Sequence, residues 1–231
     1  MLAITLLGTG SPLPDPKRAG PATLVTGGTE QFLIDAGRAV LMRLGGAGSS
    51  AGQLSAVLLT HLHSDHITDL NDVITTRWVM TFEPSPLIIV GPVGTRSVID
   101  HILASLEPDI GYRISHHGDL DYPPQVEVIE VTEGEIDLGG QVCVSCAPTD
   151  HKPVEPSIGF RFDYEGASLV VAGDTVPCEG LDRLCTGAQA LVHTVIRKDI
   201  IENVPAQRAQ DILDYHSSPE EIGRASCRER V

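Results

Sequence analysis

Long apolar runs are missing from the sequence, and their absence limits the kinds of protein that it can form. No stretch of the 231 residues approaches the 18 or more consecutive apolar residues that a membrane-spanning helix needs. The first seven residues lack the basic start and the cleavage site of a secretory signal, so we expect them to form a strand. The sequence therefore predicts a soluble, cytoplasmic protein.

Cysteines are too few and too scattered for a disulfide framework. There are five, an odd number, in 231 residues. Cys143 and Cys146 have the C-x-x-C spacing of a metal or redox pair, but the second pair that a zinc site needs is missing. Because they lie in an alternating apolar run, we expect both to be small buried residues.

Positive charge is also scarce. There are 16 Lys and Arg residues against 31 Asp and Glu residues, a formal net charge of −15. Such a field repels polyanions, and proteins that bind nucleic acid usually carry a basic patch. Acidity that serves only solubility is the alternative. We therefore expect a small-molecule substrate and no nucleic acid or membrane partner.

Four potential metal ligands follow a short apolar run. Residues 56–59 are aliphatic and too few for a helix, so they predict a buried strand. His61 and His63 lie two positions apart and point to the same side of an extended chain. Asp65 and His66 follow as the chain turns. A solvated turn rich in histidine is the alternative, but imidazole with carboxylate suits zinc, or manganese or iron(II).

Three other residues are candidates for the same site. His151 and Asp174 each follow a predicted strand, as the first cluster does. From the residues alone, His151 is equally well a ligand or a loop residue, and Asp174 reads more simply as a turn aspartate. Asp35 ends another predicted strand, where it is either a turn former or an acceptor that orients a metal-bound imidazole.

The His-x-His-x-Asp-His segment resembles the metallo-β-lactamase superfamily of hydrolases. The stretches at residues 7–12, 33–37, 173–178 and 216–218 resemble its ribonuclease Z and arylsulfatase-like branch. The resemblance implies two divalent metal ions. It implies that His151 completes a set with His61 and His63, that Asp174 bridges to a second ion bound by Asp65 and His66, and that His216 is a general acid.

The resemblance also implies the fold, a four-layer αββα sandwich of two mixed β-sheets face to face, with helices outside. We expect one such domain over residues 1–231. The patterns predict strands at 3–7, 23–25, 31–35, 56–59, 87–90, 125–131, 142–146, 158–164, 168–172 and 190–192, with a second set beginning at 125. They predict helices at 38–44, 67–80, 95–106 and 204–214, and one that opens at the capping box of Ser218 and Glu221.

Histidines outside the ligand set have simpler interpretations. His101 falls on a predicted helix and is expected at the surface. His116 and His117 are expected in a solvated loop, although they could line a substrate cleft. His193 is interpreted as a packed core residue, because the acid that follows this histidine in ribonuclease Z is replaced by Thr194.

Two further departures from the family pattern concern the substrate and the end of the chain. Ribonuclease Z carries a long arm that grips transfer RNA, but only 22 residues separate His151 from Asp174. The family's last histidine ligand comes from a strand beyond the helix at Pro219, which this sequence does not reach. Residues 225–231 break the apolar pattern and resemble a foreign tail, so we expect the last strand and helix region to be incomplete.

These patterns together predict a dinuclear metallo-hydrolase. We expect a metal-bridging hydroxide to attack a small ester, a phosphodiester first of all, because two metal ions clamp both the attacking and leaving oxygens. Asp65 would hold metal and orient the hydroxide, and His216 would assist the leaving group. An arylsulfatase, a lactonase or a β-lactamase would share every ligand. A transfer-RNA 3′-processing nuclease and a non-catalytic metal-binding fragment are alternatives of other classes. A homodimer is what the family implies.

Overall fold

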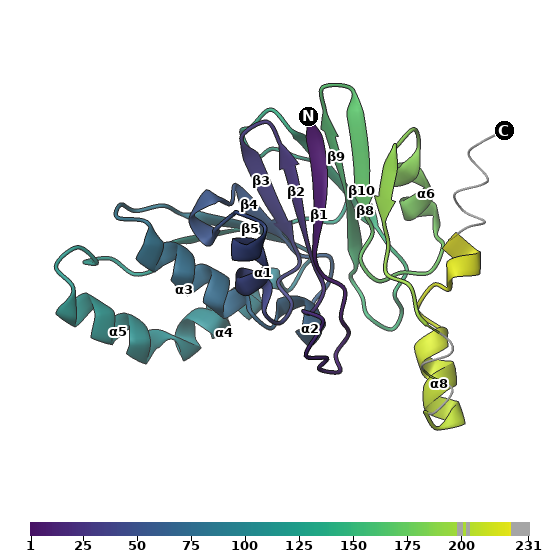
Figure 1. The fold of residues 1–231 in the computed structure, drawn as a ribbon, viewed down its shortest axis with the longest axis horizontal. Helices are drawn as coiled ribbons and strands as arrows, with labels where there is room; N and C mark the ends of the chain where they lie inside the picture. The colour runs from purple at the N-terminus through teal and green to yellow at the C-terminus, as the bar shows by residue number, and fades with distance from the viewer. Residues whose placement is uncertain (198–200, 202–203, 223–231) are drawn as a thin grey trace. The chain divides into compact units, whose positions relative to one another are not determined.

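The computed structural model describes residues 1–197, 201 and 204–222. The tail predicted at 225–231 lies outside these residues. Contacts divide the chain into two compact units, unit 1 (Met1–Val131) and unit 2 (Thr132–Val231). Each contains one mixed β-sheet with helices beside it (Figure 1). None of the described helices is long and apolar enough to cross a membrane.

Unit 1 is built on a six-stranded sheet in the order β1-β2-β3-β4-β5-β6. Its strands are β1 (Leu2–Gly8), β2 (Ala22–Gly27), β3 (Glu30–Ile34), β4 (Ala56–Leu58), β5 (Leu87–Gly91) and β6 (Val126–Glu130). The first three pair antiparallel, and β3 to β6 run parallel to one another. The strand predicted at 125–131 therefore exists as β6, but it closes the first sheet and does not begin the second.

The helices of unit 1 are α1 (Val40–Gly46), α2 (Ser64–Ile67), α3 (Leu70–Met80), α4 (Thr95–Ser105) and α5 (Glu107–His116), with a short 3-10 helix η1 (Ala51–Gln53). The helix predicted at 67–80 is divided between α2 and α3. The break falls where Asp69 leaves the helical conformation, with its carboxylate accepting the N–H of Ala39 and its own N–H donating to the carbonyl of Ala36.

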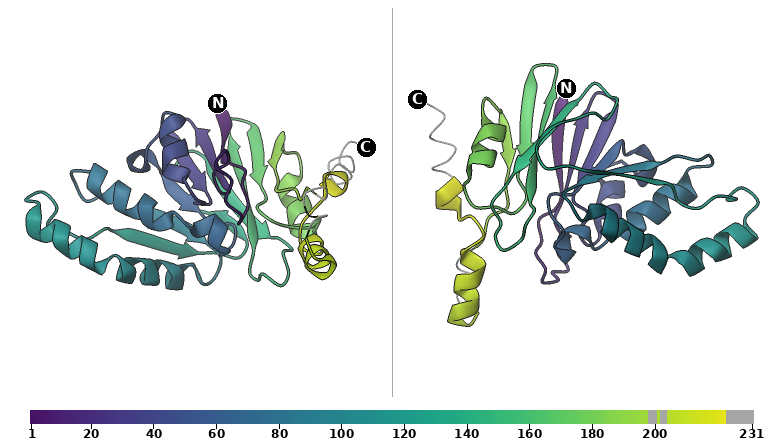
Figure 2. Two further views of the ribbon diagram at one scale, coloured as in Figure 1. Left: turned by 60° about the horizontal axis from the view of Figure 1, so that its bottom comes forward. Right: turned by 180° about the vertical axis from the view of Figure 1, so that it is seen from behind.

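Helix α5 was not expected from the sequence. It follows α4 nearly end to end (Figure 2) and contains no fully buried residue. Pro108 and two acids lie in its first turn, and Arg113 and His116 lie in its last turn, which complements the helix dipole. A loop was predicted for both His116 and His117, but His116 is the last residue of the helix and His117 is the residue after it. Both imidazoles are exposed, as predicted.

Unit 2 is built on a five-stranded sheet in the order β11-β10-β9-β8-β7. Its elements are β7 (Gly134–Ile136), β8 (Cys143–Pro148), β9 (Ile158–Tyr164), β10 (Ala167–Val171), α6 (Glu179–Cys185), β11 (Ala190–Val192) and α8 (Ala206–Leu213). Among the described strands of this sheet, β10 and β11 pair parallel and the other neighbours pair antiparallel. Leu181 and Leu184 of α6 pack on Ala147 and Val170, and this cluster fixes the strands that lead to the candidate site.

Candidate metal centre

The unit 1 residues of the predicted site gather at one edge of its sheet because their strands are parallel. Ile34 of β3 pairs in register with Leu58 of β4, so the carboxyl ends of the two strands lie side by side. Asp35 directly follows β3, and His61 follows β4 after two residues. The buried strand predicted at 56–59 is confirmed, since its residues are all 0% exposed.

Asp35 is an acceptor for three donors. Its Oδ2 accepts the Nδ1–H of His66 at 2.7 Å, and its Oδ1 accepts the backbone N–H of Thr60 at 2.9 Å. The Thr60 hydroxyl donates to the same carboxylate at 2.9 Å. Asp35 has a positive φ of 60°, a conformation that costs a non-glycine residue free energy and that these contacts hold in place. Of the two interpretations left open by the sequence, the structure places Asp35 against an imidazole.

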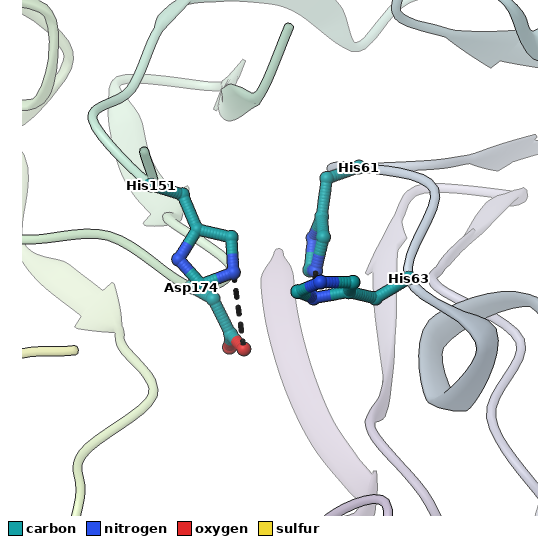
Figure 3. A group of neighbouring side chains, drawn as sticks. All are labelled: His61, His63, His151 and Asp174. Carbon is teal, nitrogen blue, oxygen red and sulfur yellow. Dashed lines mark hydrogen bonds and ion pairs between the residues drawn. The ribbon is translucent and has the colours of Figure 1, made fainter. Parts of the chain in front are cut away.

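The same network fixes the tautomer of His61. Because the single hydroxyl proton of Thr60 goes to Asp35, its oxygen accepts the Nδ1–H of His61 at 3.0 Å. The proton on Nδ1 leaves a lone pair on Nε2 of a neutral ring, and Nε2 lies 3.0 Å from Nδ1 of His63. The two imidazoles therefore point to the same side, as their spacing predicted (Figure 3).

Asp65 and His66 lie in the short helix α2, and both are buried. The Oδ2 of Asp65 is 3.9 Å from the Nε2 of His66, so these two donors face one another. A glycine is needed where the chain passes this helix, since a Cβ on Gly37 would lie 2.6 Å from the carbonyl oxygen of Asp65. The turn that follows Asp35 can thus pack directly on the backbone of α2.

The unit 2 residues also lie at one edge of their sheet. Strand β8 pairs antiparallel with β9, and β9 with β10, so β8 and β10 run in the same direction. His151 follows β8 and Asp174 follows β10, and a bridge between Asp150 and Val176 joins the two loops. The Nε2 of His151 is 3.9 Å from Oδ2 of Asp174 (Figure 3). His151 is 0% exposed and Asp174 is 7% exposed.

His216 joins this pair of residues. It follows α8, and its Nε2 lies 3.3 Å from Oδ2 of Asp174. Its Nδ1–H donates to the carbonyl oxygen of Ile212 at 2.8 Å. The capping box predicted next to it is confirmed. The N–H of Ser218 donates to Oε2 of Glu221 at 2.7 Å, and the N–H of Glu221 donates to the hydroxyl oxygen of Ser218 at 3.4 Å.

Sequence reasoning missed two residues at this edge. The backbone carbonyl of Tyr215 accepts the Nδ1–H of His151 at 2.9 Å, and the Tyr215 ring lies 4.4 Å from the ring of His216. His193 follows β11, the parallel neighbour of β10, and therefore lies close to Asp174. Burial lowers the pKa of His193, and its Nε2 has no hydrogen-bond partner among the described residues. His193 could be placed at this edge only from the pairing of β10 with β11, and that nonlocal pairing cannot be seen in the sequence.

The remaining candidates lie away from these edges. His101 is exposed on α4, where its Nδ1 bonds the carbonyl oxygen of Ser97, as expected for a surface residue. Cys146 is buried, and burial raises the pKa of its thiol to about 11. Cys143 is exposed, so the expectation that both cysteines are buried is wrong for this one. It lies on β8 with its side chain on the solvated face.

The donor atoms of these residues fit a divalent metal ion. They are imidazole nitrogens and carboxylate oxygens, which suit zinc and other first-row ions. Each imidazole whose Nδ1–H donates to a fixed oxygen has the tautomer that leaves Nε2 for a metal, as in other metal-binding histidines. His61, His66 and His151 all have this arrangement, and the acceptors are a hydroxyl, a carboxylate and a carbonyl.

Solved structures with the same fold include enzymes. Human tRNase Z, short form, is 25% identical with a TM-score of 0.73, over 98% of this chain and 88% of that one. A diphosphatase from the PhnP family has a TM-score of 0.72 at 19% identity, over 100% of this chain and 84% of that one, which shows the fold alone. The predicted metallo-β-lactamase fold is confirmed. Fold and donor set define the class of this protein as a metal-dependent hydrolase.

Sequence comparisons then give the family. A family model described as "Anti-Pycsar protein Apyc1" matches residues 2–210. The curated "Ribonuclease Z" of Mycolicibacterium paratuberculosis is 58% identical over 233 residues, which covers all of this chain and 83% of the relative. The chain belongs to the family that this model describes, and it is also a relative of proteins named ribonuclease Z. The resemblance noted in the sequence is therefore confirmed.

The comparisons correct one expectation. Net charge and the short segment between His151 and Asp174 argued for a small-molecule ester and against nucleic acid, and this conclusion is wrong. The alignment with the relative has 233 positions for 231 residues, so a protein named ribonuclease Z has no long insertion there either. Net charge is a sum over the whole surface, and it does not describe the local field of a metal site, where bound ions are the largest charges.

Proposed function

We propose that this protein is a metal-dependent ribonuclease that hydrolyses a phosphodiester bond at the 3′ side of a transfer-RNA precursor. The observation that carries the proposal is the 58% identity, over the whole chain, to a protein named ribonuclease Z. The likeness to human tRNase Z supports it. The phosphodiester expected from the sequence is retained, while the small ester is replaced by RNA.

The proposed site holds two ions, zinc first of all, with manganese or iron as alternatives. The proposal assigns one ion to three histidines and the other to Asp65 and His66, with Asp174 between them. The full ligand set is His61, His63, Asp65, His66, His151 and Asp174. The support for this set is its chemistry, since four imidazoles and two carboxylates are offered on buried or half-buried side chains.

When bound, two such ions would lower the pKa of water to about 7 and neutralise charge on the phosphate. The chain's own residues prepare that chemistry. Asp35 and Thr60 hold the protons of His66 and His61 on Nδ1, so that both rings present Nε2. The proposal gives Asp65, at the start of α2, the role of orienting the attacking water. The proton-donor role that the resemblance implies for His216 stays a prediction, as do the homodimer and the cytoplasmic location.

RNA recognition in this proposal does not need an overall basic protein. Unit 1 has seven Lys and Arg residues, of which five, at positions 17, 18, 38, 43 and 96, are exposed. Two divalent ions would add four positive charges at the site itself, where the scissile phosphate must lie. Because phosphate contacts release counterions, RNA binding should weaken steeply as salt is raised.

A substrate panel tests the proposal. The zinc-loaded chain would be given a 3′-extended transfer-RNA precursor, a bis-aryl phosphate, an aryl sulfate and a lactone at matched protein concentrations. We expect kcat/KM to be highest for the RNA by at least about 100-fold, since remote contacts with a large substrate can be used to stabilise its transition state. A sulfatase or lactonase would instead favour its own small ester. No cleavage of RNA beside rapid turnover of any small ester would refute the proposal.

A further inference from the structure

We propose that Leu62, the residue between His61 and His63, is a positioning residue that places the His63 imidazole for metal binding, and that a fixed turn at the start of α4 holds Leu62. The inference rests on the proposed function for the presence of the ion. It adds a support to the ligand set and no new ligand. All the residues involved belong to unit 1.

His63 presents a different ring nitrogen from the histidines beside it. His61 and His66 donate their Nδ1–H groups to a hydroxyl and a carboxylate, which leaves Nε2 for an ion. In His63 the atom that faces Nε2 of His61, at 3.0 Å, is Nδ1. Because Nδ1 is the ring nitrogen nearer to the backbone, its position follows the backbone conformation closely. The placing of this donor atom therefore depends on what holds the backbone around residue 62.

The segment that contains Leu62 lies outside regular secondary structure and is hydrogen-bonded on both sides. Before it, the N–H of Leu59 donates to the carbonyl oxygen of Val90 at 2.8 Å, and after it the carbonyl oxygen of His63 accepts the N–H of His66 at 3.1 Å. Neighbouring side chains of an extended chain point to opposite sides, and that of Leu62 packs against the hydrophobic core of unit 1. Leu62 thus anchors the segment between the two hydrogen bonds.

A glycine at the start of α4 receives the tip of Leu62. Strand β5 is the parallel neighbour of β4, so the loop after β5 lies beside the segment that follows β4. Gly94 in this loop is the N-cap of α4 and has a φ of 106°, which favours glycine. A Cβ at this position would lie 3.1 Å from Cδ1 of Leu62, inside ordinary van der Waals distance. The leucine therefore fits against the glycine because no side chain is there.

The turn around Gly94 is fixed by its own hydrogen bonds. The Oε1 of Glu130, at the end of β6, accepts the N–H groups of Gly94 and Arg96 at 2.8 and 3.0 Å. Thr95 is 0% exposed, and its hydroxyl donates to the carbonyl oxygen of Pro92 at 2.7 Å. Leu62 is consequently held between the core and a turn that is anchored to a neighbouring strand.

A positioning role and a merely structural role have different consequences. A zinc–nitrogen bond is about 2.0–2.1 Å long, and a usable site keeps each ligand within roughly 0.2 Å of that distance. Truncation of Leu62 would leave a space into which the backbone can relax, and the Nδ1 of His63 would move with it. A side chain that only fills the core would lower the free energy of unfolding and leave the zinc affinity of the folded chain unchanged.

The test is a zinc titration of the metal-free full chain against a competing chelator, beside urea denaturation. We expect Leu62→Ala to lower zinc affinity about 10–100-fold, as is typical of losing a group that supports a ligand. Leu62→Met, which nearly conserves the volume, should retain most of the affinity. Leu41→Ala is the matched control, because Leu41 is also half-buried against the same core. It should lower the free energy of unfolding and leave zinc affinity unchanged.

His61→Ala reports on the proposed function separately. If it weakens zinc binding while Leu62→Ala does not, the inference is overturned and the proposed function stands. If His61→Ala also leaves zinc affinity unchanged, the metal site of the proposed function fails as well. An equal loss of affinity in Leu62→Ala and Leu41→Ala would overturn the inference, because it would show a general loosening of the core.

A milder variant decides the question if Leu62→Ala does not fold by circular dichroism. Leu62→Val removes the Cδ1 atom that reaches Gly94 and keeps a branched apolar side chain. We expect its cobalt(II) form to differ from that of the unaltered chain in visible absorption, since a displaced His63 changes the ligand geometry. An identical spectrum together with unchanged zinc affinity would overturn the inference.

Discussion

The Nδ1–H of His66 donates to Oδ2 of Asp35 over 2.7 Å, across the edge where β3 ends and α2 begins. This bond joins residues 31 positions apart and leaves Nε2 as the only ring nitrogen of His66 that can bind an ion. The carboxylate also holds Thr60, and Thr60 holds His61. One aspartate therefore orients two of the proposed ligands.

Removal of that carboxylate should weaken metal binding without removing a ligand. We expect Asp35→Ala to lower zinc affinity about 10–100-fold, because His66 loses the acceptor of its Nδ1–H and Thr60, which accepts from His61, loses the carboxylate that orients its hydroxyl. Asp35→Asn, which keeps one acceptor oxygen and tolerates the positive φ, should lose less. Zinc titration against a chelator measures both. Unaltered affinity in the alanine variant would show that Asp35 serves only the turn.

Loss of His61 should abolish hydrolysis while the fold remains. Its strand β4 is packed by residues 56–58, all 0% exposed, and none of these changes in His61→Ala. We expect RNA cleavage to fall by at least about 1,000-fold, as loss of a direct ligand removes metal-assisted chemistry worth several kcal/mol. Cleavage assays and circular dichroism are the measurements, with His101→Ala as control. Full cleavage and full metal content in the variant would refute the proposed ligand set.

Stability of unit 1 should depend on a buried arginine. The guanidinium of Arg77 in α3 donates to the carbonyl oxygens of Ala51, Leu54, Ser85 and Pro86 at 2.8–3.2 Å, and burial lowers its pKa. Arg77→Met leaves these acceptors unsatisfied and should cost about 3 kcal/mol in the free energy of unfolding. Urea denaturation measures the loss.

The exposed Arg43 provides the control for that experiment. Arg43→Met should change the free energy of unfolding by less than about 0.5 kcal/mol, as expected at the surface. Equal stabilities of the two variants would contradict the role given to Arg77.

Glu130, which binds the start of α4, is expected to stabilise the folded protein in a pH-dependent way. The Oε1 of Glu130 accepts the N–H groups of Gly94 and Arg96 at 2.8 and 3.0 Å, and these bonds lower the pKa of its carboxyl. A lowered pKa in the folded state stabilises the protein above the unfolded pKa of about 4.3, and this stability is lost as pH falls through the folded value. Glu130→Gln should therefore lower the Tm at pH 7 and have less effect at pH 3.

The control is Glu127→Gln, which changes an exposed acid on the same strand. It should have little effect on the Tm at either pH. An equal loss of Tm at pH 7 and pH 3 in Glu130→Gln would show that packing, and not charge, connects Glu130 to α4.

The sequence predicted those features that depend on short spacing. The His61–His63 geometry follows from strand alternation, and the Ser218–Glu221 capping box is a local motif. Helix α5 was missed because Pro108 and Gly111, residue types that usually disfavour a helix, lie within it. The partner of β6 was misassigned because a strand's sequence does not specify which sheet it joins.

The substrate was the harder prediction. Net charge was given too much weight, since it says nothing of which residues line a site. Tyr215 was missed because its backbone carbonyl, and not its side chain, makes the bond to His151. His193 could not be placed beside Asp174 without knowing that β10 and β11 are parallel neighbours. The positions of these residues depend on nonlocal contacts, which the sequence alone does not reveal.

The most direct test of the central claim, metal-assisted hydrolysis of an RNA phosphodiester, is a single-turnover cleavage of a 3′-extended transfer-RNA precursor in ¹⁸O-labelled water. The account predicts that the zinc-loaded chain cuts the RNA and that one solvent oxygen enters the terminal phosphate of a product, with no cut after chelation. Cleavage that yields a 2′,3′-cyclic phosphate without solvent oxygen, or that persists in the metal-free chain, would contradict it.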